Sequence, residues 1–239
     1  MSMLFDLLDD LRSLLFPSGC VVCGGDIDRS MHGICTMCRY TIPLTNFWKT
    51  EDNPTKEHFA GIIPLVHASS FFYFSHDSQW RSLIHRFKYG GEWRLAESFG
   101  RWYGRELRES GLYDDVDVVM PVPLHYIKTI KRGYNQSSYL AESIAREIGK
   151  PTDRRSVRRH RNNPPQSRSS MGERWANVEN LFSVVNPKAL SGKHILLVDD
   201  VLTTGATLAS LASAILASVP DARISIATLA VSRKIDGAK

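Results

Sequence analysis

Residues 194–208 bring together carboxylates, hydroxyls and a glycine in an order that could bind a phosphorylated ligand. An apolar run ends in Asp199 and Asp200, and a short loop then leads into a segment with the apolar spacing of a helix. Backbone N–H groups at the start of a helix bind phosphate, and a glycine lets the phosphate approach closely. The residues offered by this loop and helix start are Thr203, Thr204, Gly205, Ala206 and Thr207.

The two carboxylates need a different partner, because they would repel a phosphate. As hard oxygen ligands, Asp199 and Asp200 suit sugar hydroxyls or a Mg²⁺ ion. Ligands of α/β folds bind at the carboxyl ends of strands, so this segment predicts a ribose 5-phosphate site there. It lacks the glycine patterns of nucleotide-triphosphate and dinucleotide loops. The alternative is an ordinary strand–turn–helix with threonine caps and an exposed acidic pair.

The cysteines have the spacing of a metal site. They form two pairs, each with two intervening residues: Cys20, Cys23, Cys35 and Cys38. Two such turns facing each other present four sulfurs in the tetrahedral geometry that zinc favours, and a site of four thiolates is usually structural. Disulfides are disfavoured by the reducing compartment that we expect, and a redox couple is disfavoured by the duplicated pair. We therefore expect a structural zinc ion.

The composition is that of a soluble protein with a packed core, with 43% hydrophobic and 23% charged residues. The net charge of +5 fits an anionic ligand, although mildly basic proteins are common. Residues 1–16 lack a basic start and include Asp6, Asp9 and Asp10, so they do not resemble a signal peptide. No apolar run is long enough to cross a bilayer. We expect a cytoplasmic protein with no membrane partner.

Strands and helices alternate along the chain, which predicts a parallel α/β sheet. We expect strands over residues 68–74, 116–122, 193–199 and 224–230, and helices over 3–16, 79–88, 93–108, 134–148 and 205–218. Residues 154–170 are basic and polar and predict a mobile loop. The expected organisation is an N-terminal helix and cysteine module over residues 1–45, a linker over 46–66, and an α/β domain over 67–239.

Residues 194–208 resemble the motif that binds phosphoribosyl pyrophosphate (PRPP) in type I phosphoribosyltransferases. Together with the four cysteines, they make the chain similar to the ComF (ComFC) family, bacterial proteins linked to competence for DNA uptake. The resemblance covers nearly the whole chain and rests on the order of several short motifs. These are Tyr89-Gly90-Gly91, Pro121-Val122-Pro123-Leu124, Arg132-Gly133-Tyr134-Asn135-Gln136, and then Gln166, Arg174, Asn177 and Phe182.

The resemblance implies the type I phosphoribosyltransferase fold over residues 67–239, with PRPP bound together with Mg²⁺. It also implies a pyrophosphate loop within residues 123–135, for which a solvated basic turn is the alternative. A second, mobile loop over residues 154–172 would close over the ligand, and its arginines could also bind nucleic-acid phosphates. The candidates are Lys131, Arg132 and Gly133 in the pyrophosphate loop, and Arg158, Arg159, Arg161 and Gln166 in the mobile loop.

Three classes of function follow from the resemblance. A catalytic phosphoribosyltransferase would displace pyrophosphate from the anomeric carbon of PRPP with a nitrogen nucleophile. A sensor would bind PRPP without turnover, and an adaptor would bind single-stranded DNA or a competence helicase. The sequence does not identify the acceptor, and His85, His125 and His160 are candidate bases by residue type alone. Met1 is followed by Ser2 and every cysteine is assigned to the metal module, so glutamine-dependent amidophosphoribosyltransferase activity is not expected.

Overall fold

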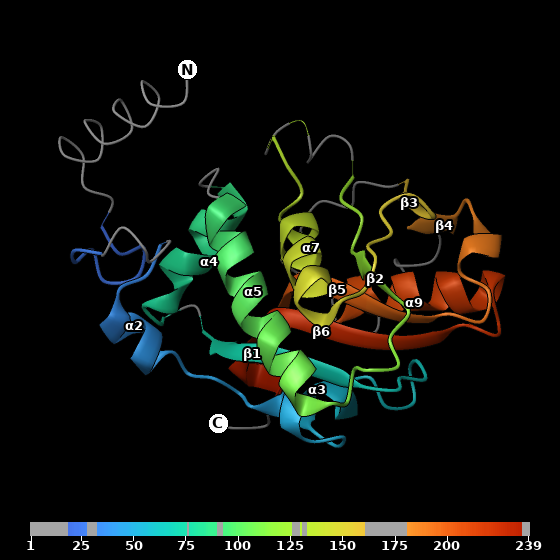
Figure 1. The fold of residues 1–239 in the computed structure, drawn as a ribbon, viewed down its shortest axis with the longest axis horizontal. Coiled ribbons are helices and arrows are strands. Elements are labelled where there is room, and N and C mark those ends of the chain that lie inside the picture. The colour runs from blue at the N-terminus through green and yellow to red at the C-terminus, as the bar shows by residue number, and fades with distance from the viewer. Residues whose placement is uncertain are drawn as a thin grey trace.

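The computed structural model describes residues 19–27, 33–75, 77–89, 93–125, 130, 133–160 and 181–235. Its centre is a four-stranded sheet with the order β1 (Ala68–Phe74), β6 (Arg223–Ser232), β5 (His194–Leu202) and β2 (Val118–Pro121). Every strand pair in this sheet is parallel (Figure 1). The two middle strands are almost continuously buried, as expected where both faces of a parallel sheet are covered.

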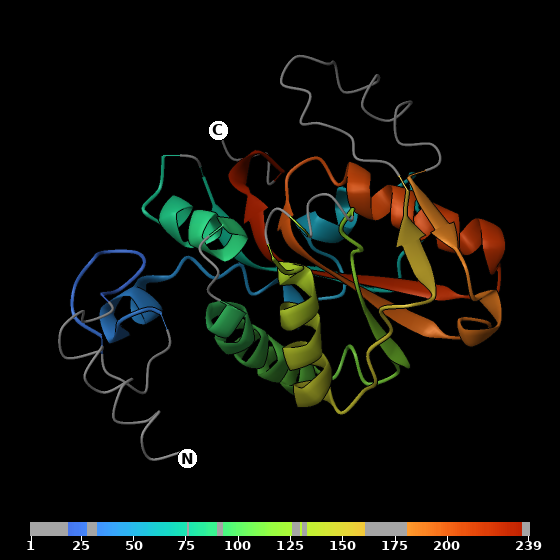
Figure 2. The same cartoon turned by 90° about the horizontal axis from the view of Figure 1, so that it is seen from above.

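Helices cover both faces of the sheet. Helices α5 (Trp93–Ser110) and α7 (Gln136–Ile148) pack on each other on one face, and α9 (Ala206–Ser218) covers the other (Figure 2). Side chains of β5 alternate between the two cores, because successive residues of a strand point to opposite faces. Leu196 lies in the core with α5 and α7, whereas Leu197 lies in the core with α9. These observations confirm the predicted fold class, a parallel α/β sheet flanked by helices.

Two glycines bring α5 and α7 unusually close together. A Cβ atom at Gly100 would lie 2.6 Å from Ser143 Cβ, and one at Gly104 would lie 2.8 Å from Glu147 Cβ. The glycines are four residues apart, so they lie on the same face of α5. Helix α7 therefore sits at a fixed distance from α5. A third helix, α4 (Trp80–Tyr89), precedes α5 in the chain.

The segment predicted as a linker, residues 46–66, belongs to the folded body. It contains the short helices η1 (Phe47–Lys49) and α3 (Pro54–Glu57). Trp48 and Phe59 are almost completely buried, and Asn53 Nδ2 donates a hydrogen bond to the Ala68 carbonyl oxygen on β1 at 2.9 Å. The prediction of a linker rested on the polar average of the segment, which conceals the aromatic residues that anchor it. The cysteine module contains the preceding helix, α2 (Thr36–Thr41).

The basic segment predicted as a mobile loop is partly a strand. Strand β3 (Val157–Arg159) pairs antiparallel with β4 (Phe182–Val184), and Val157 is opposite Val184. Residues 161–180 and the helix predicted over 3–16 lie outside the described residues. Two further short helices are η2 (Pro187–Ala189) and η3 (Arg233–Ile235). None of the helices that the structure describes is long and apolar enough to span a membrane.

Candidate functional site

Asp199 and Asp200, called the acid pair below, lie inside strand β5 and not after its end. The strand predicted over residues 193–199 continues to Leu202, and Asp199 is opposite Thr228 on β6. Ser137 Oγ on α7 donates a hydrogen bond to Asp199 Oδ1 at 3.0 Å, and the Asp200 backbone N–H donates to the same oxygen at 2.8 Å. On the other carboxylate, Asp200 Oδ2 lies 3.3 Å from Lys88 Nζ on α4. Each carboxylate is therefore held by a different helix.

The start of α7 joins these helices together. The Asn135 side chain caps α7 by accepting a hydrogen bond from the Ser137 N–H at 3.2 Å, and it donates to the Val122 carbonyl oxygen at 3.1 Å. Gln136 Nε2 donates to the Lys88 carbonyl oxygen at 2.6 Å. Tyr134 Oη donates to the carbonyl oxygen of Phe87 at 3.2 Å. The residues 134–137 thus fix the end of α4 and the end of β2 around the acid pair.

Sequence reasoning missed Lys88 and Ser137 as site residues. Lys88 directly precedes the Tyr89-Gly90-Gly91 motif, and Ser137 directly follows Asn135-Gln136. Each stands beside a motif that the family resemblance had singled out, and that position was the available signal. Neither has a spacing pattern of its own, because the contacts to the acid pair join residues 62 positions apart for Ser137 and even farther apart for Lys88.

The loop after β5 has the geometry of an anion site. Gly205 has a φ of +71°, a left-handed conformation that favours glycine, and it stands at the N-cap of α9. No side chain of the described residues caps this helix start, so its first N–H groups are open to an anion. Thr203 is exposed, while Thr204, Ala206 and Thr207 are half-buried.

Two residues of the segment 46–66, His58 and Phe59, support this loop from behind. His58 Nε2 lies 3.1 Å from the Thr204 carbonyl oxygen. A Cβ atom at position 205 would lie 2.7 Å from Phe59 Cε1, closer than real Cβ atoms approach. Position 205 is therefore restricted to glycine, both by its positive φ angle and by the aromatic side chain behind it.

Asp199 is poised to exchange a proton near neutral pH. Burial raises the pKa of the Asp199 carboxyl from its ordinary value of 3.8 to about 7, and the neighbouring Asp200 charge adds to the rise. The Asp200 N–H, the Lys88 ammonium and the Ser137 hydroxyl oppose it, because each favours the charged form.

This raised pKa predicts a stabilising substitution. A carboxyl whose pKa is higher in the folded than in the unfolded state contributes stability that is lost as pH rises from about 4 to about 7. We expect Asp199→Asn to raise the melting temperature of the ligand-free protein at pH 8 by several degrees, since 1 kcal/mol corresponds to about 2–4 °C in a chain of this size. At pH 5, between the two pKa values, the rise should be clearly smaller, because only part of the penalty has developed. Thermal unfolding at both pH values checks this, with Asp221→Asn as the control; equal shifts at both pH values would contradict it.

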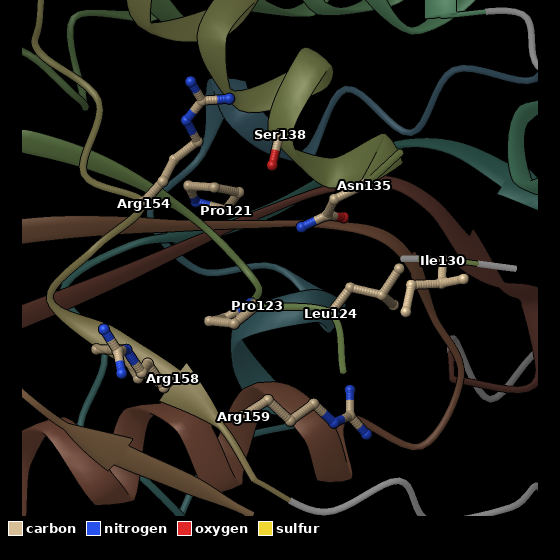
Figure 3. A pocket seen from close by; sticks show the side chains of 10 residues that line it. Pro121, Pro123, Leu124, Ile130, Asn135, Ser138, Arg154, Arg158 and Arg159 are labelled. Atoms are coloured by element: carbon tan, nitrogen blue, oxygen red, sulfur yellow. The ribbon is translucent and has the colours of Figure 1, made fainter. Parts of the chain in front are cut away.

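A cavity of about 460 Å³ opens beside the start of α7. In Figure 3, Asn135 and Ser138 lie on one side of it, and Arg158 and Arg159 of β3 lie on the opposite side. The Arg159 guanidinium lies over the Phe182 ring, 5.4 Å from its centroid. Burial lowers the pKa of Arg159, while the charge of Asp199 opposes that change.

The structure describes only some of the remaining residues that the sequence suggested for the site. Gly133 has a φ of +80°, which suits the close turn expected of a pyrophosphate loop. The described residues do not include Lys131, Arg132, Arg161 or Gln166. Of the candidate bases, His125 is buried, and its Nε2 lies 3.2 Å from the carbonyl oxygen of His160.

A second polar cluster resembles a hydrolase triad but has a structural role. Asp115 Oδ1 lies 2.9 Å from His194 Nδ1, and His194 Nε2 lies 2.8 Å from Ser225 Oγ. Both His194 and Ser225 are completely buried, and the Ser225 hydroxyl accepts a hydrogen bond from the His67 backbone N–H at 3.0 Å. A nucleophile needs access to substrate, so this cluster serves to connect the starts of β5 and β6.

The four cysteines converge on one point. Their sulfur atoms all lie within 4.8 Å of one another, a donor set that fits a tetrahedral metal ion with four thiolate ligands. Burial raises the pKa of Cys20, but hydrogen bonds from nearby backbone N–H groups outweigh it and lower this pKa to about 6. The cysteine module is packed onto α5: a Cβ atom at Gly33 would overlap Leu95, and the Arg39 guanidinium lies 4.7 Å from the Trp102 ring centroid.

Residues 134–239, which include β5, the loop after it, α9 and β6, match the family described as "Phosphoribosyl transferase domain". The chain is 26% identical over 202 residues to competence protein F of Haemophilus influenzae, covering 81% of this chain and 88% of that protein. It is 28% identical over 211 residues to competence protein ComFC of Bacillus subtilis, covering 88% and 76%. The chain is thus a homologue of the ComF (ComFC) proteins, which confirms the family resemblance.

Two further matches cover a smaller part of this chain and of the matched protein. The DNA utilization protein YhgH of Escherichia coli K12 is 33% identical over 138 residues, which span 56% of this chain and 60% of that protein. A glutamine PRPP amidotransferase structure from B. subtilis, complexed with ADP and GMP, is 17% identical with a TM-score of 0.41. That match covers 61% of this chain and 30% of the amidotransferase.

Proposed function

We propose that this protein binds PRPP with Mg²⁺, as a phosphoribosyltransferase-family protein acting in competence and DNA uptake or in nucleotide metabolism. The proposal rests on the position of the acid pair of β5, directly before the start of α9. That helix start has no side-chain cap, and His58 and Phe59 support the loop that leads into it. The N–H groups of residues 205–207 would bind the 5-phosphate, aided by the hydroxyls of Thr203, Thr204 and Thr207. Asp199 and Asp200 would accept hydrogen bonds from the ribose hydroxyls.

The donor set also fits Mg²⁺, because carboxylate oxygens are the hard ligands that this ion prefers. When bound, Mg²⁺ would neutralise negative charge on the pyrophosphate of the ligand. The protein's own residues would hold the sugar: Ser137 orients Asp199 by a hydrogen bond, and Lys88 lies beside Asp200. Orientation of the sugar and electrostatic stabilisation would supply most of any rate enhancement.

The pyrophosphate end of the ligand would extend toward the cavity beside α7. Lys131, Arg132 and Gly133 are the proposed pyrophosphate loop, and Arg158, Arg159, Arg161 and Gln166 are the proposed closing residues. The half-buried Arg159 supports this direction, because it lines the cavity. A reaction in this site would displace pyrophosphate from the anomeric carbon by a nitrogen nucleophile.

Calorimetry of the zinc-loaded full chain with PRPP and Mg²⁺ tests the proposal. We expect PRPP to bind more tightly than ribose 5-phosphate, and ribose 5-phosphate more tightly than inorganic phosphate, because each adds groups that the site can hold. A nucleobase screen for pyrophosphate release would then identify an acceptor. Absence of heat and of any thermal stabilisation with PRPP and Mg²⁺ would refute the proposed function.

A second candidate function is an adaptor for single-stranded DNA or a helicase partner. It is favoured by the exposed side chains of Arg154, Arg155 and Arg158 around β3, and by relatives named for competence and DNA utilization. A cluster of exposed arginines binds nucleic-acid phosphates by releasing counterions.

We expect Arg158, Arg159 and Arg161 replaced together by alanine to weaken single-stranded DNA binding and flatten its salt dependence. Each lost phosphate contact should reduce the slope of log K against log salt by about 0.7. Fluorescence anisotropy over a salt series measures the slope. The control replaces Arg81, Arg101 and Arg105 on α4 and α5, which removes the same charge elsewhere; an equal effect of both variants would mean that only net charge matters.

A further inference from the structure

Lys88 stands at the proposed sugar site, with its main chain fixed by hydrogen bonds and its ammonium beside Asp200. Gln136 and Tyr134 donate hydrogen bonds to the carbonyl oxygens of Lys88 and Phe87, which fixes the last turn of α4. The ammonium lies 3.3 Å from Asp200 Oδ2, and the exposed fractions of the two side chains are 27% for Lys88 and 13% for Asp200. A lysine has a flexible four-carbon stem and a compact charge, so its ammonium can move while its backbone stays in place.

Asp200 has a cationic partner without any ligand. The Lys88 ammonium on α4 lies 3.3 Å from Asp200 Oδ2, and its charge also opposes the rise in the pKa of Asp199. The pair of carboxylates therefore already has a neighbouring cation. A free divalent cation would have to displace the ammonium from Asp200 and would meet its repulsion. A phosphorylated sugar bound with a metal ion brings its own anionic groups, on which a displaced ammonium can form a new ion pair.

We infer that Lys88 is an exchangeable counter-ion that decides which ligand the acid pair accepts. It occupies Asp200 in the ligand-free protein and excludes a divalent cation that arrives alone. When a metal-bound, pyrophosphorylated sugar enters, the Lys88 ammonium moves from the carboxylate to a phosphate oxygen of that ligand. The inference rests on the proposed function for the identity of the ligand. The exclusion of free metal does not depend on it.

Mn²⁺ binding to the zinc-loaded full chain tests the exclusion directly, by the loss of the free-ion paramagnetic resonance signal. We expect Lys88→Met to bind Mn²⁺ at least about tenfold more tightly than the unmodified protein, since removing a neighbouring like charge is worth more than 1.4 kcal/mol at short range. Lys88→Arg keeps the charge and should still exclude the ion. Equal Mn²⁺ affinity in Lys88→Met and the unmodified protein would overturn the inference, and so would free Mn²⁺ access in Lys88→Arg.

The second experiment measures the affinity of the same variants for PRPP with Mg²⁺. Lys88→Met should bind it about 10- to 100-fold more weakly, the range for a charged hydrogen bond. Lys88→Arg should also bind it more weakly, because the arginine fork holds Asp200 more firmly. Unchanged PRPP affinity in Lys88→Met would overturn the exchange.

Two further variants serve as controls for the Mn²⁺ and PRPP binding experiments. Lys150→Met removes the same charge from a lysine whose ammonium donates to the Asp114 carbonyl oxygen at 2.8 Å, at the other end of α7, and should change neither affinity. Lys88→Gln replaces Lys88→Met if that variant does not fold. If the unmodified protein fails to bind PRPP, the proposed function fails. The Mn²⁺ comparison still decides whether Lys88 excludes a free divalent cation from the carboxylates.

Discussion

Most of the PRPP affinity is expected to disappear when Asp199 and Asp200 are both replaced by asparagine. The start of α9 can hold the 5-phosphate without either carboxylate, but the ribose hydroxyls then lose their charged acceptors on β5. Losing charge-assisted hydrogen bonds of this kind should cost about 1.5–3 kcal/mol each, or more than a hundredfold in affinity for the pair. Calorimetry with PRPP and Mg²⁺ measures the loss.

Inorganic phosphate separates loss of sugar recognition from loss of structure. It uses only the loop, so the double variant should bind phosphate nearly as well as the unmodified protein. Asp114→Asn together with Asp117→Asn, at the far end of the sheet from the proposed site, removes the same charge and should leave PRPP affinity unchanged. Unchanged PRPP binding in the Asp199/Asp200 variant would show that the pair does not contact the sugar, and equal loss of both ligands would indicate a collapsed loop.

Loss of the metal from the cysteine module should lower stability strongly. We expect one zinc ion per chain and a loss of several kcal/mol in the free energy of unfolding for Cys35→Ser, because a structural zinc ion contributes about 10–16 kcal/mol of binding free energy in small modules. The loss should reach the main core, since Cys20 and Cys38 are buried in the same cluster as Leu95 and Phe99. Elemental analysis and denaturant unfolding provide the two measurements.

The affinity for PRPP should change far less than stability in Cys35→Ser, when measured at a temperature where the protein is folded. The cysteines contact α5, whereas the proposed site lies between β5, α7 and α4. Met37→Ser, which alters an exposed residue of the same module, is the control for a change that leaves the metal ligands intact. Zinc-free protein prepared under reducing conditions with unchanged stability would contradict the prediction.

The sequence predicted the parts of this fold that depend on local pattern. The apolar run of β1 matches residues 68–74 at both ends, and the helix predicted over 205–218 begins one residue later as α9. The first contains a short aromatic run, and the second is an apolar, alanine-rich segment that follows the turn at Gly205. The strand β5 was predicted to end at residue 199, because carboxylates disfavour a strand interior; ladder contacts with β6 carry it to Leu202.

The parts that could not be predicted depend on contacts between distant segments. Lys88 meets Asp200 only because Gln136 and Tyr134 fix the end of α4, and none of these positions has a spacing pattern in common. Similarly, Phe59 supports Gly205 from a segment whose average composition is polar. The acid pair and the glycine loop are visible in the sequence, whereas the residues that hold them are not.

The order of the strands in the sheet has a consequence for how the chain folds during synthesis. The sheet has β5 and β6 at its centre, with β1 and β2 at its edges, yet the two central strands are the last of the four to be synthesised. While the chain is being synthesised, β1 and β2 lack the strands that separate them in the finished sheet. Their apolar faces stay uncovered until the C-terminal third of the chain has been made. Pairing between sequence-distant parallel strands is slow and leaves unpaired edges exposed in the meantime. The proposed sugar-phosphate site on β5 is therefore completed only after the C-terminal third has been made, and a chain that stops before β6 would expose unpaired strands to chaperones and proteases.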